Sequence, residues 1–428
     1  MNVSQRVLYN TLAQIAGKAA LLLAGLVTLR LATSYLGLHG FGEYATVLAL
    51  APILLVFADL GISTLLAREL VQSPDRREEL AGTLLWFRLG ASAVVLLGCV
   101  ALVPFLPYEH HVRVGLLIAC AGVSLLSVGS FATPFFQVSL RLDLVALLDC
   151  AVAVLTVGLV ATVTLLDLGF YALVGVNAAV GLANLVCSSF LVRRFWRPLL
   201  RFDRQLARRL IADGLPLAAV IVLGLLHFRF DAVLLSLFRP AEDVGVYTVA
   251  YRFLEQSLVL PGVFMAAVFP LLAAAVRGGD AADVVRKAFS FLLLIGAPLA
   301  LVLVVLANPL VMLVAGDGFE SAVLPLRILA PALLFTFVNA VFASVLIALN
   351  RQRALILVSL AGLTLNVLAN LYAIPRFGYV GAAVTTVISE AAGLCAVFLL
   401  AKRACPFRLS PRLVTKTEVA LLLGRQSA

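Results

Sequence analysis

Long apolar stretches separated by short polar turns run through the whole chain. A membrane-spanning helix needs about 20 apolar residues, and windows of that length give about 12 predicted spans. These spans cover 11–34, 43–67, 80–104, 113–138, 144–166, 170–192, 213–238, 244–274, 284–308, 322–349, 353–374 and 379–401. The eighth and tenth exceed what a bilayer requires, and we expect them to project beyond the lipid. The pattern predicts an all-α integral membrane protein.

The amino-acid composition is typical of an integral membrane protein. Of 428 residues, 63% are hydrophobic and 13% charged, with a mean hydropathy of +1.10. The six cysteines occur singly, so we expect neither a disulfide framework nor a metal site built on them. The sequence has no GxSxG, P-loop or HExxH motif, so we expect a non-enzyme without a cofactor. Energy would come from H⁺ or Na⁺, the membrane potential or the substrate gradient.

The basic residues indicate an orientation. When residues toward the span ends are assigned to the nearer side, 24 of the 32 Lys and Arg residues fall on one side of the predicted membrane, 4 on the other and 4 deeper within spans. The positive-inside rule then places both termini in the cytoplasm, and the net charge of +10 reflects topology rather than binding to nucleic acid. The arginine-rich segment between spans six and seven has apolar residues at helical spacing. It is expected to rest on anionic membrane lipids, to join two halves of the chain, or both.

The two halves of the chain resemble each other. "GFGEYATVLAL" (40–50) resembles "DVGVYTVAYRF" (243–253), and "LGFYALVGVNAAVG" (168–181) resembles "FGYVGAAVTTVISE" (377–390). Six plus six spans in the same orientation imply parallel repeats with a substrate site between two lobes. The predicted domains are an N-lobe of helices 1–6 (1–196), a cytoplasmic basic amphipathic linker (197–212), a C-lobe of helices 7–12 (213–402) and a cytoplasmic tail (403–428).

Ionisable side chains inside the spans need an explanation. A central Arg or Asp opposes insertion by about 2.5–3.5 kcal/mol, whereas each Leu, Ile, Phe or Val favours it by about 0.3–0.6 kcal/mol. The seventh span carries Arg229 and Asp231 among just enough apolar residues to insert. These charged groups must therefore face water or one another rather than lipid.

We interpret the intramembrane arginines as a cationic lining for an anionic headgroup such as a diphosphate, with interhelical pairing as the alternative: Arg30, Arg88, Arg229 and Arg252. The acidic residues are candidates for coupling to a cation or proton, or for balancing the arginines: Glu43, Asp59, Asp231, Glu255 and Glu390. Arg252 and Glu255 stand three residues apart, so they can pair on one helix. Asn177, Asn366 and Asn370 add polar positions.

Three stretches carry a family resemblance. "LGLHGFGEYATVLALAPILLVFADLGISTLLAREL" (36–70) resembles the first-and-second-span signature of the polysaccharide biosynthesis proteins. These are the oligosaccharide-lipid flippases of the multidrug/oligosaccharidyl-lipid/polysaccharide (MOP) exporter superfamily. "FRFDAVLLSLFRPAEDVGVYTVAYRFLEQSLVLPGVFMAAVFPLLA" (228–273) and "NLYAIPRFGYVGAAVTTVISE" (370–390) agree with it. One departure is "SYLG", where many members place a basic residue before the first LG; here Arg30 lies one turn earlier.

The resemblance implies two pseudo-symmetric six-helix lobes in a MATE-like V shape. It also implies an activity: flipping an undecaprenyl-diphosphate-linked oligosaccharide across the bacterial inner membrane, by alternating access around a cationic cavity. The product would serve O-antigen, capsule or exopolysaccharide synthesis, with a polysaccharide polymerase and glycosyltransferases as partners. Alternatives are a cation-coupled exporter of the multidrug and toxin extrusion type, a peptidoglycan-precursor lipid flippase, and a membrane scaffold for assembly enzymes.

Overall fold

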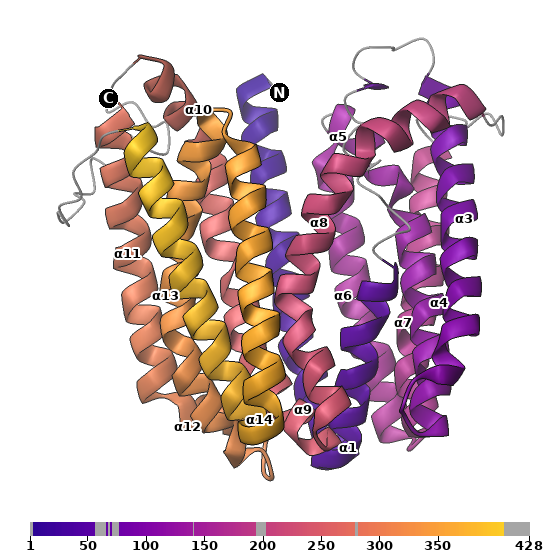
Figure 1. The fold of residues 1–428 in the computed structure, drawn as a ribbon. Coiled ribbons are helices and arrows are strands. Elements are labelled where there is room, and N and C mark those ends of the chain that lie inside the picture. The colour runs from indigo at the N-terminus through magenta and orange to yellow at the C-terminus, as the bar shows by residue number, and fades with distance from the viewer. Residues whose placement is uncertain are drawn as a thin grey trace. The chain divides into compact units, whose positions relative to one another are not determined.

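The computed structural model describes residues 3–55, 66, 69–70, 77–139, 141–193, 203–278 and 281–405, and its regular secondary structure in these ranges is helical (Figure 1). The chain divides into two compact units. Unit 1 comprises Met1–Arg229 with Val314–Gly316, and unit 2 comprises Phe230–Leu313 with Asp317–Ala428. The predicted domain boundaries stay a prediction, because much of the proposed linker lies outside the described residues.

Unit 1 is a bundle of long helices. They are α1 (Val3–Leu55), α3 (Arg77–Leu102), α4 (His110–Gly129), α5 (Thr133–Val138), α6 (Leu142–Leu165), α7 (Gly169–Arg193) and most of α8 (Arg204–Phe238). The long α1 leaves helical geometry at Gly37, whose φ of 66° favours glycine. Its first arm runs beside α6, where Lys18 pairs with Asp149 at 2.7 Å. Its second arm packs against α4. Gly37 therefore divides α1 into the first two predicted spans.

Glycines allow α4 and α7 to approach closely. A Cβ at Gly122 would lie 2.7 Å from the backbone of Asn177 and Ala178, and one at Gly181 would lie 2.6 Å from the carbonyl oxygen of Gly122. Gly129 meets Leu185 in the same way. Small residues that let helix backbones touch are a common packing device in membrane proteins, where apolar burial alone does not drive helices together.

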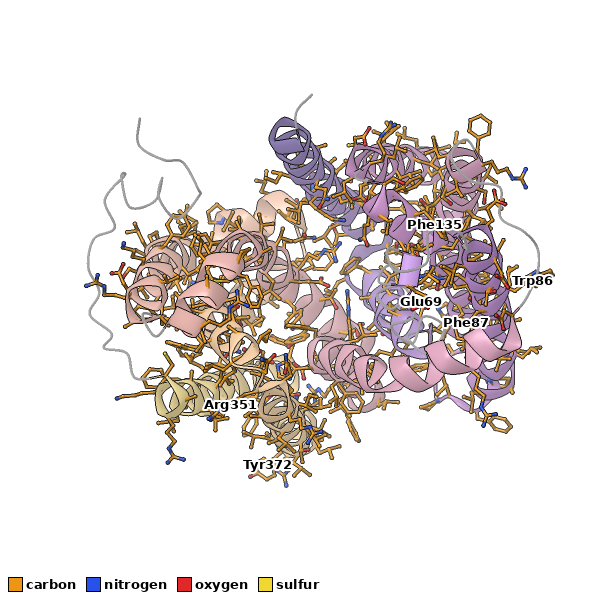
Figure 2. The ribbon with its side chains drawn as sticks, turned by 90° about the horizontal axis from the view of Figure 1, so that it is seen from above. Glu69, Trp86, Phe87, Phe135, Arg351 and Tyr372 are labelled. Atoms are coloured by element: carbon orange, nitrogen blue, oxygen red, sulfur yellow. The ribbon has the colours of Figure 1, made fainter. Side chains whose placement is uncertain are left out.

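At one end of unit 1, apolar side chains from several helices form a buried core. It gathers leucines and phenylalanines of α3, α5, α6 and the 3₁₀ segment Ser130–Ala132 with two residues from beyond α1: Leu66, Leu70, Leu80, Leu84, Phe131, Phe135, Phe136 and Leu144. Figure 2 labels Phe135 and Phe87, which packs against this core, and Trp86, which is exposed. Leu80 and Leu84 place the first half of α3 in this core, and Arg88 follows one turn after Leu84.

Unit 2 contains the remaining helices. They are the end of α8, α9 (Ala241–Ser257), α10 (Val259–Gly278), α11 (Ala281–Val305), the short α12 (Ala307–Val314), α13 (Val323–Ala348) and α14 (Gln352–Ala404). Like α1, α14 leaves helical geometry once, at Gly378 with φ 57°. Contacts of Asn366 with Ser389 and of Asn370 with Thr385 show that its two arms run antiparallel. The α14 hairpin therefore contains the last two predicted spans.

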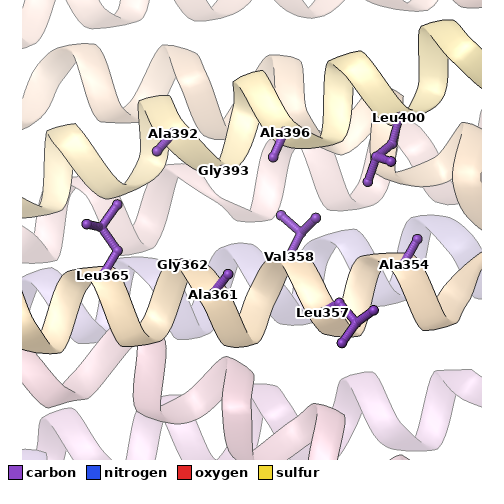
Figure 3. Close-up of a pocket in the computed structure, with 10 residues that line it drawn as sticks. All are labelled: Ala354, Leu357, Val358, Ala361, Gly362, Leu365, Ala392, Gly393, Ala396 and Leu400. Carbon is purple, nitrogen blue, oxygen red and sulfur yellow. The ribbon is translucent and has the colours of Figure 1, made fainter.

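The turn of the α14 hairpin lies against an ion pair. Arg239 Nε donates to Asp243 Oδ2 at 2.7 Å, and a Cβ at Gly378 would lie 2.6 Å from that carboxylate oxygen. Toward the other end of the hairpin, small side chains leave an apolar groove between the arms, lined by residues such as Ala361, Gly362 and Gly393 (Figure 3). The residues that line this groove are alanines, glycines, leucines and a valine.

The predicted spans agree with the helices. Nine stretches of the described residues are long and apolar enough to cross a membrane. Two of them contain the glycine breaks and hold two spans each, so the nine stretches correspond to eleven predicted spans, and α8 contains the remaining one. The second predicted span, 43–67, runs past the end of α1 at Leu55 into positions that lie largely outside the described residues. The fourth span passes through a 3₁₀ segment, Ser130–Ala132, just before Pro134, and the eighth is interrupted at Leu258, three residues before Pro261. A proline ring clashes with the carbonyl four residues earlier, which disfavours regular helix at these points. The chain is a multi-pass membrane protein.

Candidate functional site

A buried carboxylate forms the centre of the candidate site in unit 2. Asp231 of α8 is only 3% exposed. Its Oδ1 accepts the amide Nδ2 of Asn370 at 2.7 Å, and its Oδ2 accepts the hydroxyls of Thr386 at 2.7 Å and Tyr247 at 2.9 Å. These donors stand on α14 and α9, so the aspartate joins three helices. A buried ionisable group within a membrane bundle is a functional candidate on energetic grounds.

The network continues between the two arms of α14. Asn370 Nδ2 also donates to Asn366 Oδ1 at 3.0 Å, Asn366 Nδ2 donates to Ser389 Oγ at 3.2 Å, and the Thr385 hydroxyl donates to Asn370 Oδ1. All four side chains are buried. Because both arms of the hairpin contribute, the two helices are held together by polar contacts as well as by packing. We call Asp231, Tyr247, Asn366, Asn370, Thr385, Thr386 and Ser389 the Asp231 cluster.

The close oxygen–oxygen contacts around Asp231 outnumber the hydroxyl hydrogens that could lie between the oxygens. The Thr386 hydroxyl oxygen lies 2.7 Å from Asp231 Oδ2, 2.8 Å from the Ala382 carbonyl and 3.1 Å from the Tyr247 hydroxyl oxygen, which itself lies 2.9 Å from Asp231 Oδ2. Two hydroxyl hydrogens serve these four contacts. Two contacts remain: one more proton would satisfy one of them, and a hard cation that prefers oxygen ligands would suit the group of oxygens as a whole.

Glu390 lies near this cluster along α14. It is 9% exposed, and the Thr336 hydroxyl of α13 donates to its Oε2 at 3.1 Å. It stands next to Ser389 in the chain. A second buried carboxylate therefore lies close in sequence to the cluster, and its predicted part in coupling or charge balance stays a prediction.

The predicted pairing on α9 is confirmed. Arg252 Nη1 lies 2.9 Å from Glu255 Oε2, and their side chains are 32% and 28% exposed. The pair is thus partly open to its surroundings, unlike Asp231. Its predicted role towards a substrate stays a prediction.

The other three predicted arginines belong to unit 1. Arg30 of α1 is exposed, and Arg229 of α8 is partly buried. Arg88 of α3 is 2% exposed and donates from Nη1 to the carbonyl of Ser127 and the hydroxyl of Ser130, where α4 ends. The geometry of Arg88 favours a structural role, and all three substrate assignments stay predictions.

Of the two acidic site candidates near the start of the chain, the structure describes Glu43 but not Asp59. Glu43 of α1 has a side chain 12% exposed and lies 2.8 Å from the imidazole of His111 on α4. Asp59 lies outside the described residues. Neither predicted coupling role is tested by these placements.

The sequence pattern pointed to Asp231, Asn366 and Asn370 but not to their hydroxyl partners. Tyr247 is part of the repeated segment 243–253, and the pattern gave it no role at a site. The pattern did not single out Thr385, Thr386 or Ser389. A turn at Gly378 is the feature that would have pointed to these hydroxyl partners. Folding the segment into an antiparallel hairpin there places Thr385 beside Asn370 and Ser389 beside Asn366.

The chain matches two family models. "Polysaccharide biosynthesis protein" matches residues 3–276, which is more than half of the chain. "MatE" matches residues 216–372. Among curated proteins, the chain is 28% identical over 182 residues to the "Probable flippase AglR" of Haloferax volcanii, covering 41% of this chain and 37% of that protein. The chain spans about two fifths of the length of the curated relatives it matches.

Solved structures show the same fold at low sequence identity. One is "Lipid II flippase MurJ, inward closed conformation", with a TM-score of 0.72 and 13% identity over 94% of this chain and 88% of that chain. Another is a point mutant of the MATE transporter VcmN of Vibrio cholerae, with a TM-score of 0.66 and 18% identity over 94% and 96%. These structures show the fold, and the family model over residues 3–276 shows that the chain belongs to the polysaccharide biosynthesis protein family.

Proposed function

We propose that this protein is a flippase that moves a polyprenyl-diphosphate-linked oligosaccharide between the leaflets of a bacterial inner membrane, with both termini in the cytoplasm. The observation that carries the proposal is the match of residues 3–276 to the polysaccharide biosynthesis family. The relative named a probable flippase supports it. The substrate would serve synthesis of O-antigen, capsule or exopolysaccharide, and polymerase and glycosyltransferases would be its functional partners.

Arg252 is the strongest candidate for contact with the diphosphate. Its guanidinium is partly exposed and meets Glu255 through Nη1 at 2.9 Å, which leaves other N–H groups of its five-donor fork to bind a phosphate. Arg30 and Arg229 of unit 1 are further candidates. Arg88 is not included, because its guanidinium is buried against the end of α4.

The Asp231 cluster is proposed as the coupling site. Movement of a charged headgroup needs an energy source, and a proton or Na⁺ bound at Asp231 would connect α8, α9 and α14 in one of the transporter's states. Two features support this: the excess of close oxygen–oxygen contacts over hydrogens, and the burial of a carboxylate that is costly to keep charged inside a membrane. Ion binding that favours one conformation shifts the population toward it.

Reconstituted vesicles test the proposal. The purified chain is inserted into liposomes that contain a polyprenyl-diphosphate oligosaccharide, and a membrane-impermeant glycosidase measures how fast the inner-leaflet sugar becomes accessible outside. We expect the wild-type chain to accelerate this step over empty liposomes. Arg252→Ala should slow it about tenfold or more, since a charge-assisted hydrogen bond contributes about 1.5–3 kcal/mol.

The matched control is Arg376→Ala. Arg376 is an exposed arginine of the same unit that stacks on Tyr372 at 4.0 Å, and its replacement should leave the rate unchanged. Absence of acceleration by the wild-type chain would overturn the flippase proposal. Equal loss in both arginine variants would remove Arg252 from the site.

A second candidate function is cation-coupled export of drugs. The "MatE" match over residues 216–372 favours it. The same vesicles distinguish the two, because an exporter would move a fluorescent organic cation down an imposed ion gradient and leave the lipid-linked sugar in place.

A further inference from the structure

Histidine and glutamate side chains gather in unit 1, where the arm of α1 after Gly37 meets the start of α4. His39 and Glu43 belong to the first turns of α1 after Gly37, Glu109 is the N-cap of α4, and His111 is in its first turn. Three of the chain's four histidines, at positions 39, 110 and 111, stand in these two segments. The proposed transport function uses none of these imidazoles.

The distances between their polar atoms are short. His111 Nε2 lies 2.8 Å and His39 Nε2 lies 3.5 Å from the same oxygen, Glu43 Oε1. Glu109 Oε2 lies 3.5 Å from His111 Nδ1. One ligand atom each from Glu43, Glu109 and His111 can be chosen so that all three lie within 4.8 Å of one another.

The inner part of this group is held in position by packing. The Glu43 side chain is 12% exposed and that of His111 35%. The His111 ring lies edge-on to Phe170, with centroids 5.6 Å apart and an interplanar angle of 83°. Phe170 fits there because residue 115 is glycine, where a Cβ would lie 2.8 Å from the Phe170 ring. The outer two side chains, His39 at 62% and Glu109 at 75% exposed, have room to adjust.

These residue types and spacings fit a transition metal. Zinc holds nitrogen and oxygen ligands at about 2.0–2.2 Å in a tetrahedron, which places ligand atoms about 3.3 Å apart. The contacts of Glu43 Oε1 with the two imidazoles, 2.8 and 3.5 Å, bracket that separation. Imidazole nitrogen selects zinc and its neighbours over Mg²⁺ and Ca²⁺, which prefer oxygen alone.

We propose that Glu43 and His111, completed by His39, form a binding site for Zn²⁺ or a similar divalent transition metal, while Glu109 lies on the opposite ring nitrogen of His111, where it would accept the Nδ1–H and orient the ring. The ion would join the second arm of α1 to the start of α4, so its binding would stabilise unit 1. The site is independent of the proposed transport activity and assigns Glu43 a role other than ion coupling.

Metal titration of the purified full-length chain tests this site. After treatment with a chelator, Zn²⁺ is added in competition with a fluorescent zinc indicator, and thermal unfolding is recorded with and without the ion. We expect one tight equivalent per chain and a higher unfolding temperature with Zn²⁺, because a ligand that binds only the folded state stabilises it. Excess Mg²⁺ should not compete.

Variants distinguish this site from adventitious binding. Glu43→Gln and His111→Ala should each weaken Zn²⁺ binding about tenfold or more and abolish the thermal shift. His110→Ala is the matched control, since His110 is an exposed neighbour of His111 and should bind like wild type. Glu43→Gln preserves side-chain size, so it provides a folded variant if His111→Ala does not fold. Absence of a tight equivalent in the wild type, or an equal loss in His110→Ala, would overturn the proposal.

Discussion

Asn370 donates its amide to Asp231 at 2.7 Å, across 139 residues of sequence. The same amide reaches Asn366 at 3.0 Å, so one side chain connects the buried carboxylate of α8 to the interior of the α14 hairpin. Any change of charge at Asp231 will therefore be felt by the contacts between the two hairpin arms. This relationship makes a local protonation or ion-binding event capable of altering helix packing in unit 2.

Asp231→Asn should uncouple transport from the ion gradient while the chain stays folded. The asparagine keeps one oxygen to accept from Asn370, and its amide group can donate to the Tyr247 or Thr386 oxygens, so no buried polar group is orphaned. It cannot take up a proton or balance the charge of a cation. In vesicles, the acceleration produced by an imposed Na⁺ or H⁺ gradient should fall about tenfold, corresponding to a coupling free energy of about 1.4 kcal/mol.

Asp317→Asn is the control for this experiment. It also removes a carboxylate from unit 2, but at an exposed position, and the gradient dependence should remain. If Asp231→Asn responded to both gradients as the wild type does, the Asp231 cluster would not be the coupling site.

Gly122→Ala should destabilise the chain through helix packing. Its Cβ would lie 2.7 Å from the α7 backbone, and backbone cannot move aside as a flexible side chain can. We expect a loss of about 1–3 kcal/mol in stability, as for other overpacked positions, measured by unfolding in detergent. Gly175→Ala on α7 is the comparison, because nothing lies within 4 Å of its Cβ. Equal stability of the two variants would mean that α4 and α7 are not in close contact.

The two glycine breaks should differ in tolerance. Gly37 combines φ 66° with ψ −175°, a backbone conformation essentially restricted to glycine, so Gly37→Asn should lower the free energy of unfolding by about 1–3 kcal/mol through backbone strain, although its Cβ meets nothing within 4 Å. At Gly378 the Cβ would also lie 2.6 Å from the Asp243 carboxylate. Gly378→Asn should therefore lower the free energy of unfolding by about 1–3 kcal/mol more than Gly37→Asn does. If the two variants lost the same free energy of unfolding, backbone strain alone would account for both.

Local sequence patterns predicted the features that depend on local physics. Apolar runs of bilayer length gave the spans, because burial in lipid acts on each helix separately. The spacing of three residues gave the contact between Arg252 and Glu255, because it arises within one helix.

Contacts between distant segments could not be read in this way. Thr386 reaches Asp231 across 155 residues, and its hydroxyl has no pattern that distinguishes it from the many Ser and Thr side chains that bond to their own helix. The free-energy cost of inserting Arg88 into a membrane likewise shows only that its guanidinium needs polar partners. It does not show whether a substrate or the end of α4 supplies it.

Arg88 and Arg252 should therefore separate stability from transport. Arg88 is 2% exposed and donates to Ser127 and Ser130, so Arg88→Ala should lower the free energy of unfolding by about 1–3 kcal/mol by removing buried hydrogen bonds to a charged group. Arg88→Lys should also destabilise, because an ammonium lacks the planar fork that reaches both acceptors. Arg252→Ala, at a side chain 32% exposed, should leave unfolding nearly unchanged. Transport per folded molecule in vesicles should follow the opposite order: retained in Arg88→Lys and lost in Arg252→Ala. Full stability with abolished transport in Arg88→Ala would instead place Arg88 at the substrate.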